Sequence, residues 1–485
     1  MQIINKLEKI SEAVWEIPKT YQKGMLVPAR FYGTEKIIEA IEGGVLQQIA
    51  NVATLPGIVK NAICMPDGHR GYGFPIGGVA AMDSEVGVIS PGGIGFDINC
   101  GMRLLNTNLS YDQVKPYINK LINKLFQKIP AGVGKKGFIK ISQSEFRKLV
   151  EQGSRWCIDN GFGWPQDLER TEEGGRFPGA DSNCVSRKAI ERGYRQVGTL
   201  GSGNHYLEVQ VVKPENIADK ELAKQLGIKV PNQVVVMFHC GSRGFGHQIG
   251  TDYLQSFLKV MQSKYGMKIR DKELASAPFK SREGQNYYRA MQCAVNMAFA
   301  NRQVILHRIR EVFAEVFNKS AKDLGMNQVY DVAHNTAKLE KHQIEGKTKE
   351  LLVHRKGATR AYPPGSEDLP SFYKETGQPV IIGGSMETGS YLLVGCSSGK
   401  DTFYTTAHGS GRIMSRTKAR KKFRGKSLLA KLKEKGIYVN AASLSGLAEE
   451  AGGAYKDIDE VAKSIQLAGI SKPVAKLVPI GNIKG

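Results

Sequence analysis

The sequence has no pair of cysteines in a C-x-x-C arrangement, and its seven cysteines are scattered and odd in number. This usage argues against a disulfide scaffold and favours a reducing compartment. No run of about 18 apolar residues occurs, so we expect no membrane-spanning helix. Residues 1–23 mix Glu, Lys and apolar residues without an apolar core, which argues against a signal peptide. These absences predict a cytoplasmic protein.

The chain also lacks the Pro-, Ser- or Gly-rich linkers that separate domains, and it has no repeat at solenoid periods. Acidic residues are the minority among the charges, since 46 Asp and Glu face 68 Lys and Arg, a formal net charge of +22. This excess predicts a polyanion partner such as RNA or DNA. A surface that is merely rich in lysine is the alternative.

With 485 residues, 41% of them hydrophobic, the chain can bury a large core. Hydrophobic periodicity predicts helices over residues 34–53, 111–128 and 283–317. Strands are expected as short runs within 57–105 and at 209–212, 234–238, 379–382 and 391–395. Because the chemistry-bearing residues are interleaved with all of these elements, we predict one mixed α/β unit that shares a single site.

Asp97 and Cys100 lie three residues apart between glycines, in Gly-Gly-Ile-Gly-Phe-Asp97-Ile-Asn-Cys100-Gly. Both side chains can therefore face one point. A thiolate can bridge two cations there, and Cys with Asp and His suits Zn²⁺, Mn²⁺ or Fe²⁺. A buried structural cysteine beside a turn-capping aspartate is the alternative for this pair alone.

Three histidines adjoin strand-like runs, namely His205, His239 and His334. Strand ends are where α/β proteins place their ligands. One such histidine is more often a structural residue, but three in similar contexts favour a metal cluster.

The other histidines outside the glycine-rich motifs lack this setting. His307 lies in a charged helical pattern and is predicted to be structural or on the surface. His342 and His354 lie in the Lys-rich region 338–356, so we expect them to face solvent or RNA.

His408 stands in Ala-His408-Gly-Ser-Gly-Arg412, ahead of a strongly basic segment. From Arg412 to Lys435 there are eleven Lys or Arg and one acid, Glu434. Glycines let a phosphate approach the backbone, and Arg412 can clamp it bidentately. His408 could be a fourth metal ligand, an acid or base, or a nucleophile that carries a phosphoryl or nucleotidyl group. A plain anion-binding loop is the alternative.

Six motifs follow one another along the chain. They are Cys64-Met-Pro-Asp67-Gly-His69-Arg-Gly-Tyr-Gly-Phe-Pro-Ile-Gly-Gly-Val-Ala, the Asp97 to Arg103 stretch, Gly-Ser-Gly-Asn-His205, His239-Cys-Gly-Ser-Arg243-Gly-Phe-Gly-His247-Gln, His334-Asn335 and His408-Gly-Ser-Gly-Arg412. Taken together in this order, they resemble the motifs of the RtcB-type RNA ligases, the tRNA-splicing ligases. The likeness runs from about residue 25 to Gly485. It implies one α+β domain over residues 1–485, with mixed sheets and surrounding helices around a deep basic active-site cleft.

The resemblance implies an enzyme that joins an RNA 3′-phosphate or 2′,3′-cyclic phosphate to a 5′-hydroxyl, with GTP and two Mn²⁺ ions, in tRNA splicing and RNA repair. A histidine takes GMP, the GMP moves to the RNA 3′-phosphate, and the 5′-hydroxyl then displaces it. His408 would be that nucleophile, and Asp67 would fix its tautomer. Cys100 would bridge two metals, with His205 and His239 completing one site and Asp97 and His334 the other.

The same resemblance implies the surroundings of the nucleotide: Asn204, Asn335, Gly383, Gly384, Ser385, Met386, Ser390, Gly409, Ser410 and Gly411. Glu208 would accept hydrogen bonds from the guanine N1–H and N2 amine, which adenine cannot supply. Tyr206 and Tyr455 would meet the base faces, and Lys484 would reach the base from the tail. Arg243 and Arg412 would contact RNA phosphate, with segment 412–435 and tail 450–485 contributing to RNA and nucleotide binding.

Two positions depart from the family pattern, since Ser410 stands where Ala is usual and Gly68 where Val is common. The resemblance also implies an archease-type activating protein, and we expect a monomer. Two rival functions remain. A metal-dependent phosphoesterase that opens cyclic phosphates would need the metal residues but not Glu208, Lys484 or a nucleophilic His408. A non-catalytic RNA-binding factor would need only the basic surface.

Overall fold

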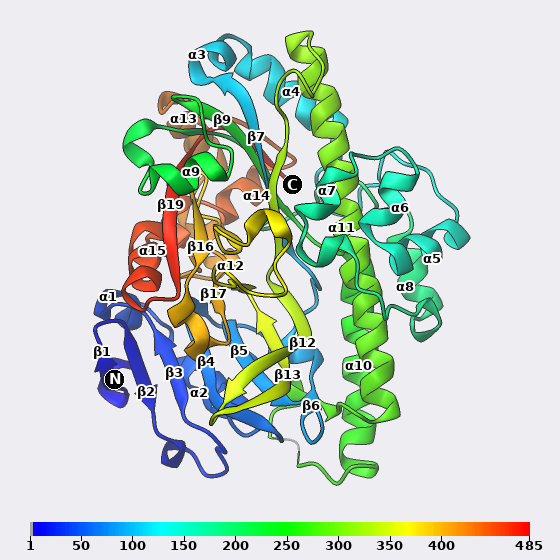
Figure 1. Ribbon diagram of the computed structural model, residues 1–485, viewed down its shortest axis with the longest axis vertical. Helices are drawn as coiled ribbons and strands as arrows, with labels where there is room; N and C mark the ends of the chain where they lie inside the picture. Colours follow the sequence, from blue (N-terminus) through cyan, green and yellow to red (C-terminus); the bar gives the residue numbers. More distant parts are fainter. Residues whose placement is uncertain (1–2, 269) are drawn as a thin grey trace.

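The computed structural model describes residues 3–268 and 270–485. Two large β-sheets lie at the centre of the molecule (Figure 1). The strands of the first sheet are β1 (Glu8–Ser11), β2 (Val14–Ile17), β3 (Ala29–Tyr32), β4 (Ile58–His69), β5 (Ile76–Asp83), β12 (Asn335–Ile344) and β13 (Lys347–Lys356). Their order in the sheet is β1-β2-β3-β4-β5-β13-β12, and all neighbouring pairs are antiparallel except β3 and β4.

The strands of the second sheet are β7 (Gly101–Ser110), β8 (Tyr206–Val212), β9 (Gln233–Cys240), β11 (Gln328–Ala333), β15 (Pro379–Ile382), β16 (Ser390–Gly395), β18 (Tyr438–Ala441) and β19 (Ser471–Lys484). Their order is β11-β7-β9-β8-β19-β16-β15, and β18 pairs in parallel with β19. Two small ribbons join β6 (Val88–Ile89) to β10 (Ala277–Pro278) and β14 (Ala358–Arg360) to β17 (Thr405–Ala407). The chain crosses from the second sheet to the first between β11 and β12, at His334.

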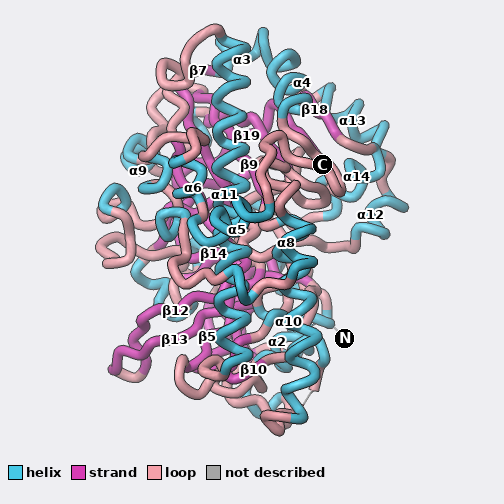
Figure 2. The backbone as a smooth tube through the Cα atoms, turned by 90° about the vertical axis from the view of Figure 1, so that its right-hand side faces the viewer, coloured by secondary structure: helices cyan, strands magenta, loops and turns pink. Residues whose placement is uncertain are grey.

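Helices cover the sheets. They are α1 (Glu35–Glu39), α2 (Gly43–Val52), α3 (Tyr111–Val114), α4 (Ile118–Lys128), α5 (Gln143–Gln152), α6 (Ser154–Asp159), α7 (Gln166–Glu169), α8 (Arg187–Gly193), α9 (Lys220–Gln225), α10 (Arg243–Ser263), α11 (Arg282–Phe317), α12 (Arg416–Lys422), α13 (Gly425–Glu434), α14 (Leu444–Glu449) and α15 (Ile458–Leu467). Figure 2 shows α5, α8, α10 and α11 as a helical layer in front of the strands. The architecture is therefore α+β, with mixed sheets and surrounding helices.

The central strands of the second sheet are buried on both faces, which explains their continuous apolar runs. In β8, Leu207 and Val209 pack into one hydrophobic cluster, while Tyr206 and Val212 pack into another on the opposite face. Because side chains alternate along a strand, Glu208 shares the face of Tyr206 and is carried into the protein interior.

The long helix α11 confirms the helix predicted at 283–317. Ser281 caps its first turn by accepting from the Gly284 N–H at 3.1 Å, and Asn318 ends it in the left-handed conformation, with φ of 50°. Its middle is buried all round, including the polar side chains of Asn301 and Arg302. This helix therefore also supplies polar groups to the interior.

The predicted strands are confirmed as well. β15 covers 379–382, β16 covers 391–395, β8 and β9 contain 209–212 and 234–238, and β4 to β7 occupy 57–105.

Two predicted helices are each interrupted. Residues 34–53 form α1 and α2 rather than one helix, because Glu42 is extended ahead of two glycines, Gly43 and Gly44. Residues 111–128 form α3, a 3₁₀ turn at Lys115–Tyr117, and α4, because Pro116 lacks an N–H and interrupts the helical ladder.

The prediction that His342 and His354 face solvent or RNA is wrong, since both are buried. His354 lies on β13 between β5 and β12, opposite Ala80 and Ala337, and its Nε2 accepts the Ser90 N–H at 3.2 Å. His342 Nε2 lies 3.0 Å from a carboxylate oxygen of Glu340. Both histidines are structural.

No helix in the described part of the chain has the length and apolar character of a membrane span.

Candidate active site and metal centre

The predicted metal ligands gather at the ends of four adjacent strands of the second sheet, β11, β7, β9 and β8. Strand register brings them together, because β7 and β8 begin where β9 and β11 end. Cys100 precedes β7, His205 precedes β8, His239 lies near the end of β9 and His334 follows β11. Four segments that are far apart in sequence thus present their side chains to one point.

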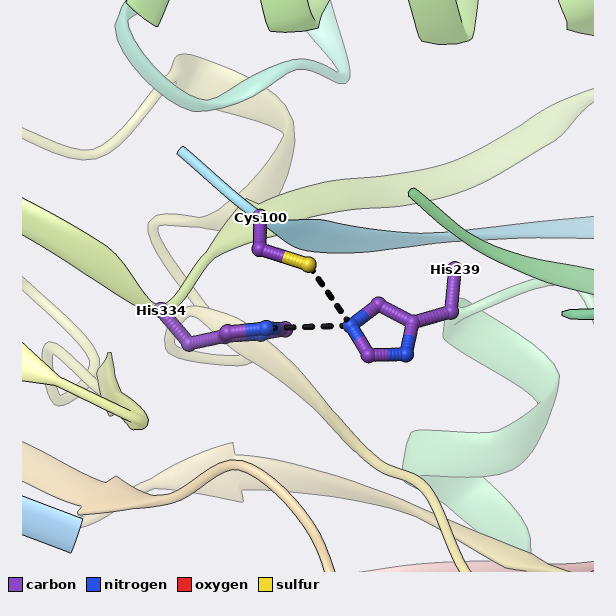
Figure 3. Close-up of side chains that lie close together, drawn as sticks. All are labelled: Cys100, His239 and His334. Atoms are coloured by element: carbon purple, nitrogen blue, oxygen red, sulfur yellow. Dashed lines mark hydrogen bonds between the residues drawn. The ribbon is translucent and has the colours of Figure 1, made fainter. Parts of the chain in front are cut away.

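The first ligand group consists of Cys100, His239 and His334 (Figure 3). His239 Nε2 lies 3.0 Å from Cys100 Sγ and 3.0 Å from His334 Nε2, and all three side chains are buried. His239 Nδ1 lies 3.1 Å from the Asn204 carbonyl oxygen. A hydrogen bond donated from Nδ1 to that carbonyl leaves the Nε2 lone pair free for a cation. Burial lowers the pKa of His239 and His334 well below the usual range, so both are neutral, as metal ligation requires.

The second ligand group consists of Asp97, Cys100 and His205. His205 Nε2 lies 3.2 Å from Cys100 Sγ and 2.9 Å from Asp97 Oδ2. Burial, with Arg243 nearby, lowers the pKa of His205 to about 4. Burial alone would raise the pKa of Asp97, but Arg243 and His205 outweigh it and keep the carboxylate ionised. Asp97 Oδ1 is buried and has no hydrogen-bond partner among the described residues, so it can serve a cation.

The two groups share Cys100, as a bridging thiolate would require. Their pairing differs from the one that the resemblance implied, because Asp97 accompanies His205, and His239 accompanies His334. Burial and the Asp97 charge raise the pKa of the Cys100 thiol. A bound cation would offset that cost, since the thiolate is the ligand. The mixed set of thiolate, imidazole and carboxylate fits Mn²⁺, Fe²⁺ or Zn²⁺.

His408 lies beside the first ligand group, with its ring centre 4.6 Å from that of His334. Its Nδ1 is 2.5 Å from Asp67 Oδ2, on a fully buried carboxylate at the end of β4. Burial alone would raise the pKa of Asp67, but His408 outweighs it and the pKa is lowered. The ionised carboxylate therefore accepts from Nδ1–H, and the neutral ring in this tautomer would carry its lone pair on Nε2. Neither ligand group of the described residues includes His408, which favours a nucleophile over a fourth ligand.

A cavity of about 700 Å³ connects these features. Most of the predicted residues line it: Asp97, Cys100, His239 and His334 of the metal set, His408, and Asn204, Tyr206, Glu208, Asn335, Gly383, Gly384, Ser385, Met386, Gly409, Ser410, Gly411, Arg412, Tyr455 and Lys484. The others stand one layer behind, each against a residue that lines the cavity: Asp67 against His408, His205 and Arg243 against Asp97, and Ser390 against Gly384. The structure thus brings all of the predicted site residues to one place.

Glu208 and Lys484 occupy neighbouring strands at one end of this cavity. Lys484 Nζ lies 4.9 Å from the centre of the Tyr206 ring. Burial raises the pKa of Glu208 to about 7 against the opposing effect of Lys484. Burial likewise lowers the pKa of Lys484 against the effects of Glu450 and Glu208. A deeply desolvated acid beside a lysine can discriminate strongly among ligand polar groups.

Sequence reasoning missed Glu450, which lines the cavity and is nearly fully buried. Its carboxylate lies 3.3 Å from Arg412, 3.6 Å from Arg416 and 3.4 Å from Lys484, and it accepts from the Tyr455 hydroxyl. Glu450 follows an ordinary helix end in the sequence, so no local pattern reveals this role. His69 also lines the cavity; its Nδ1 lies 2.9 Å from the Asp67 carbonyl oxygen, and burial lowers its pKa to about 4.

The two arginines predicted to contact RNA phosphate are engaged inside the protein. Arg412 donates to Met414 O, Glu450, Tyr455 and Glu449 O. Arg243 donates to Gly241 O, Leu200 O and Asp97. Each therefore helps to shape the site.

The two departures from the family pattern have clear settings. Ser410 lines the cavity, and its buried Oγ has no hydrogen-bond partner among the described residues, so it offers one further polar contact to a ligand. A Cβ on Gly68 would lie 2.4 Å from Cys64 Sγ, so the buried thiol fills the space that a larger residue would need.

A pair of cation sites with a common thiolate, beside an imidazole whose free nitrogen is fixed by a carboxylate, is suited to phosphoryl or nucleotidyl transfer. The arrangement of these side chains is therefore typical of metal-dependent enzymes that transfer nucleotidyl groups. The family model described as tRNA-splicing ligase RtcB matches residues 48–485.

Full-length relatives agree with that match. A tRNA-splicing ligase RtcB of Thermococcus kodakarensis is 52% identical over 481 residues, 99% of each chain. One of Archaeoglobus fulgidus is 51% identical over 480 residues, again 99% of each chain. An RNA-splicing ligase RtcB homolog 1 of Entamoeba dispar is 46% identical, over 97% of this chain and 89% of its own. The chain belongs to the RtcB family.

Proposed function

We propose that this protein is a GTP- and Mn²⁺-dependent RNA ligase that joins an RNA 3′-phosphate or 2′,3′-cyclic phosphate to a 5′-hydroxyl through a histidine–GMP intermediate. The observation that carries the proposal is the Asp67–His408 pair beside two ligand groups that share Cys100, all at one cavity. The relatives named as tRNA-splicing ligases support it. A phosphoesterase alone would have no need for a nucleophile fixed in this way.

His408 Nε2 attacks the α-phosphorus of GTP, a P–N bond forms, and pyrophosphate leaves with the electron pair of the broken P–O bond. Asp67 holds the proton on Nδ1 and stabilises the positive charge that develops on the ring. An oxygen of the RNA 3′-phosphate then attacks the same phosphorus, and His408 leaves as a neutral imidazole. The RNA end now carries GMP. The 5′-hydroxyl oxygen attacks the RNA phosphorus and gives its proton to solvent, and GMP leaves with the electron pair of the broken P–O bond. A 2′,3′-cyclic phosphate is opened by water to a 3′-phosphate before these steps.

Asp97 and His205 would hold one Mn²⁺, His239 and His334 the other, and Cys100 would bridge them. Bound there, the ions would neutralise phosphate charge and stabilise attacking and leaving oxygens. The surrounding chain orients these ligands, since the backbone carbonyl oxygen of Asn204 accepts from His239 Nδ1–H and so fixes the tautomer of His239.

Glu208 reads the guanine edge in this proposal, with Lys484, Tyr206 and Tyr455 around the base. The physiological substrates proposed are tRNA halves or broken RNA ends, held along the basic segment 412–435. We also propose an archease-type activating protein as partner, and a monomeric enzyme of the cytoplasm.

The test is to incubate the protein with Mn²⁺ and GTP labelled at its α-phosphorus. We expect an acid-labile, base-stable label on the protein, the signature of a P–N bond to histidine. In parallel, RNA with a 2′,3′-cyclic phosphate and RNA with a 5′-hydroxyl are supplied with and without GTP. Opening of the cyclic phosphate without labelling or joining would make the protein a phosphoesterase and would overturn the ligase assignment.

A further inference from the structure

Two buried amides meet the carboxylate of Glu208 from behind the cavity wall. β8 and β19 run antiparallel, and their register places Asn482 directly opposite Glu208. Because side chains alternate along a strand, Gln210 projects from the same face of β8 as Glu208. Only Glu208 of the three lines the cavity, so the two amides lie one layer deeper.

Each amide serves a different oxygen of the carboxylate. Asn482 Nδ2 donates to Glu208 Oε1 at 2.5 Å, and Gln210 Nε2 donates to Glu208 Oε2 at 2.7 Å. Gln210 Nε2 also lies 3.3 Å from Ser390 Oγ, which accepts the Gly384 N–H of the cavity wall at 3.4 Å. Asn482 and Gln210 are fully buried.

These amides are placed to donate rather than to fill a general network. Their carbonyl oxygens, Gln210 Oε1 and Asn482 Oδ1, have no hydrogen-bond partner among the described residues. A buried acceptor without a hydrogen-bond partner is costly in free energy. Both amides nevertheless leave their carbonyl oxygens unpaired and direct their NH₂ groups to the Glu208 carboxylate. Backbone pairing already joins β8 to β19, so the amides are not needed to connect the strands.

A carboxylate has about four lone-pair directions, and each amide occupies one of them. One direction on each oxygen then remains for a ligand in the cavity, which matches the N1–H and N2 amine of a guanine edge. Burial raises the pKa of Glu208 to about 7, while Lys484, Gln210 and Asn482 act in the opposite direction. The amides thus favour the ionised form, which alone accepts two hydrogen bonds from the base.

We propose that Gln210 and Asn482 are positioning residues for nucleotide choice: their amide N–H groups hold Glu208 ionised and aimed at the guanine edge. The inference rests on the proposed role of Glu208 in reading guanine. It predicts that neither amide touches the nucleotide and that both act on its affinity alone.

The test measures single-turnover labelling of the enzyme by α-labelled GTP, with excess Mn²⁺, as a function of GTP concentration and pH. The variants are Asn482→Leu and Gln210→Met, which keep side-chain size and remove the donors. We expect the half-saturating GTP concentration at pH 7 to rise about tenfold in each variant, while the maximal rate is retained. Labelling by ATP, which lacks the N1–H, should be unchanged, so the preference for GTP falls by the same factor.

The pH profile separates this role from a merely structural one. In the unaltered enzyme, GTP affinity should increase as pH rises through the pKa of Glu208, near 7, because the carboxylate becomes ionised. In the variants the same increase should occur about one pH unit higher. The charged and titratable groups that face Glu208 are Lys484 on β19 and Tyr206 on β8. Tyr455 lies beyond Tyr206, Glu450 and Arg416 lie beyond Lys484, and all are unchanged in these variants.

The matched control is Gln233→Met on β9, a buried amide of the same sheet whose contacts are the backbone of Lys229, Val230 and Gly227. It should lower stability without moving the GTP affinity or its pH midpoint. If both amide variants fold and keep the unaltered GTP affinity and pH midpoint, the proposal is wrong. The two amides lie on different strands, so if one variant does not fold, the other still tests the proposal. Asn482→Ser is a milder substitution to use if Asn482→Leu does not fold. Glu208→Gln is run alongside, because an unchanged GTP preference there would overturn guanine reading by Glu208 itself.

Discussion

Asp67 Oδ2 lies 2.5 Å from His408 Nδ1 and also accepts the backbone N–H groups of His408 and Gly409, at 3.1 and 3.2 Å. One oxygen thus fixes both the ring and the loop that carries it. Lys456 anchors the backbone that carries Asp67, because its buried Nζ donates to the flanking carbonyls, Pro66 O at 2.9 Å and Gly68 O at 2.7 Å. The orientation of His408 therefore depends on a carboxylate whose own backbone is anchored on both sides.

Asp67→Asn should leave the fold and the metal ligands in place but present an amide where the imidazole needs an acceptor. The His408 tautomer would be lost along with the charge that stabilises the imidazolium. We expect the rate of GMP transfer to His408 to fall by roughly two to four orders of magnitude. Single-turnover labelling with α-labelled GTP measures this rate, and a fall of less than about threefold would contradict the role given to Asp67.

The pairing of the ligand groups can be tested by counting bound Mn²⁺ in double variants. Asp97→Ala with His205→Ala disables one group twice, so it should lose no more metal than either single variant. Asp97→Ala with His334→Ala disables both groups, and Cys100→Ala does so alone, so each should lose both ions. Elemental analysis of the dialysed protein gives the stoichiometry. The opposite result for the first two double variants would restore the pairing of Asp97 with His334.

Much of the fold was predictable because the signals are local. The apolar runs of β8 and β9 and the long periodic pattern of α11 specify their own elements. The burial of His354 was not predictable, since it depends on β13 becoming an inner strand between β5 and β12. His342 lies on the edge strand β12, and its burial depends on Glu340 and on the rings of Phe403 and Tyr404 beside it. The neighbouring lysines suggested a surface, but tertiary packing decides burial.

The site divides in the same way. Histidines and a cysteine among glycines marked the ligands, but their pairing follows from the strand order β11-β7-β9-β8, which no local pattern encodes. Glu450 was missed because its partners Arg412, Arg416 and Lys484 come from separate segments. Gln210 and Asn482 were missed because an ordinary amide gains meaning only from the register of β8 against β19.

Arg302 connects α11 to the two segments that carry the metal ligands Cys100 and His239. It makes two hydrogen bonds to Asp331, each at 2.8 Å, and donates to the backbone carbonyls of Asn99 and Cys240 at 2.8 and 3.0 Å. These carbonyls adjoin Cys100 and His239. Arg302→Met leaves Asp331 with Arg103 alone and removes the side-chain donor from two carbonyls, so we expect a loss of about 3 to 5 kcal/mol in unfolding free energy. Denaturant unfolding measures it, and a loss below about 1 kcal/mol would show that the network is dispensable.

Helices α12 and α13 belong to the basic segment that we propose to hold the RNA backbone. Among the described residues, no carboxylate pairs with Lys421, Lys422 or Arg424, whereas Lys431 and Lys435 are paired with Glu387. Reversing the first three charges should weaken RNA binding and flatten its logarithmic salt dependence by about 2, if each contacts one phosphate. Labelling of His408 by GTP should persist. Fluorescence anisotropy over a salt series makes the measurement.

The matched control for this surface reverses three exposed lysines on other elements, Lys220 on α9, Lys341 on β12 and Lys347 on β13. It changes the net charge equally, so a general electrostatic effect would weaken RNA binding in both proteins. Equal weakening would show that α12 and α13 are only a solvated basic face.

His408→Ala separates the nucleophile from the metal centre, since neither ligand group of the described residues includes this side chain. Both ions should remain bound, while the GMP adduct and the joining of 3′-phosphate ends should be lost. RNA whose 3′-phosphate already carries guanosine should still be joined to a 5′-hydroxyl, because the imidazole is needed only to carry GMP to that end. The three assays are metal content, labelling by α-labelled GTP, and ligation of the capped RNA. An acid-labile GMP adduct that persists in this variant would place the nucleophile on another histidine, with His69 as the neighbour in the same cavity to replace next.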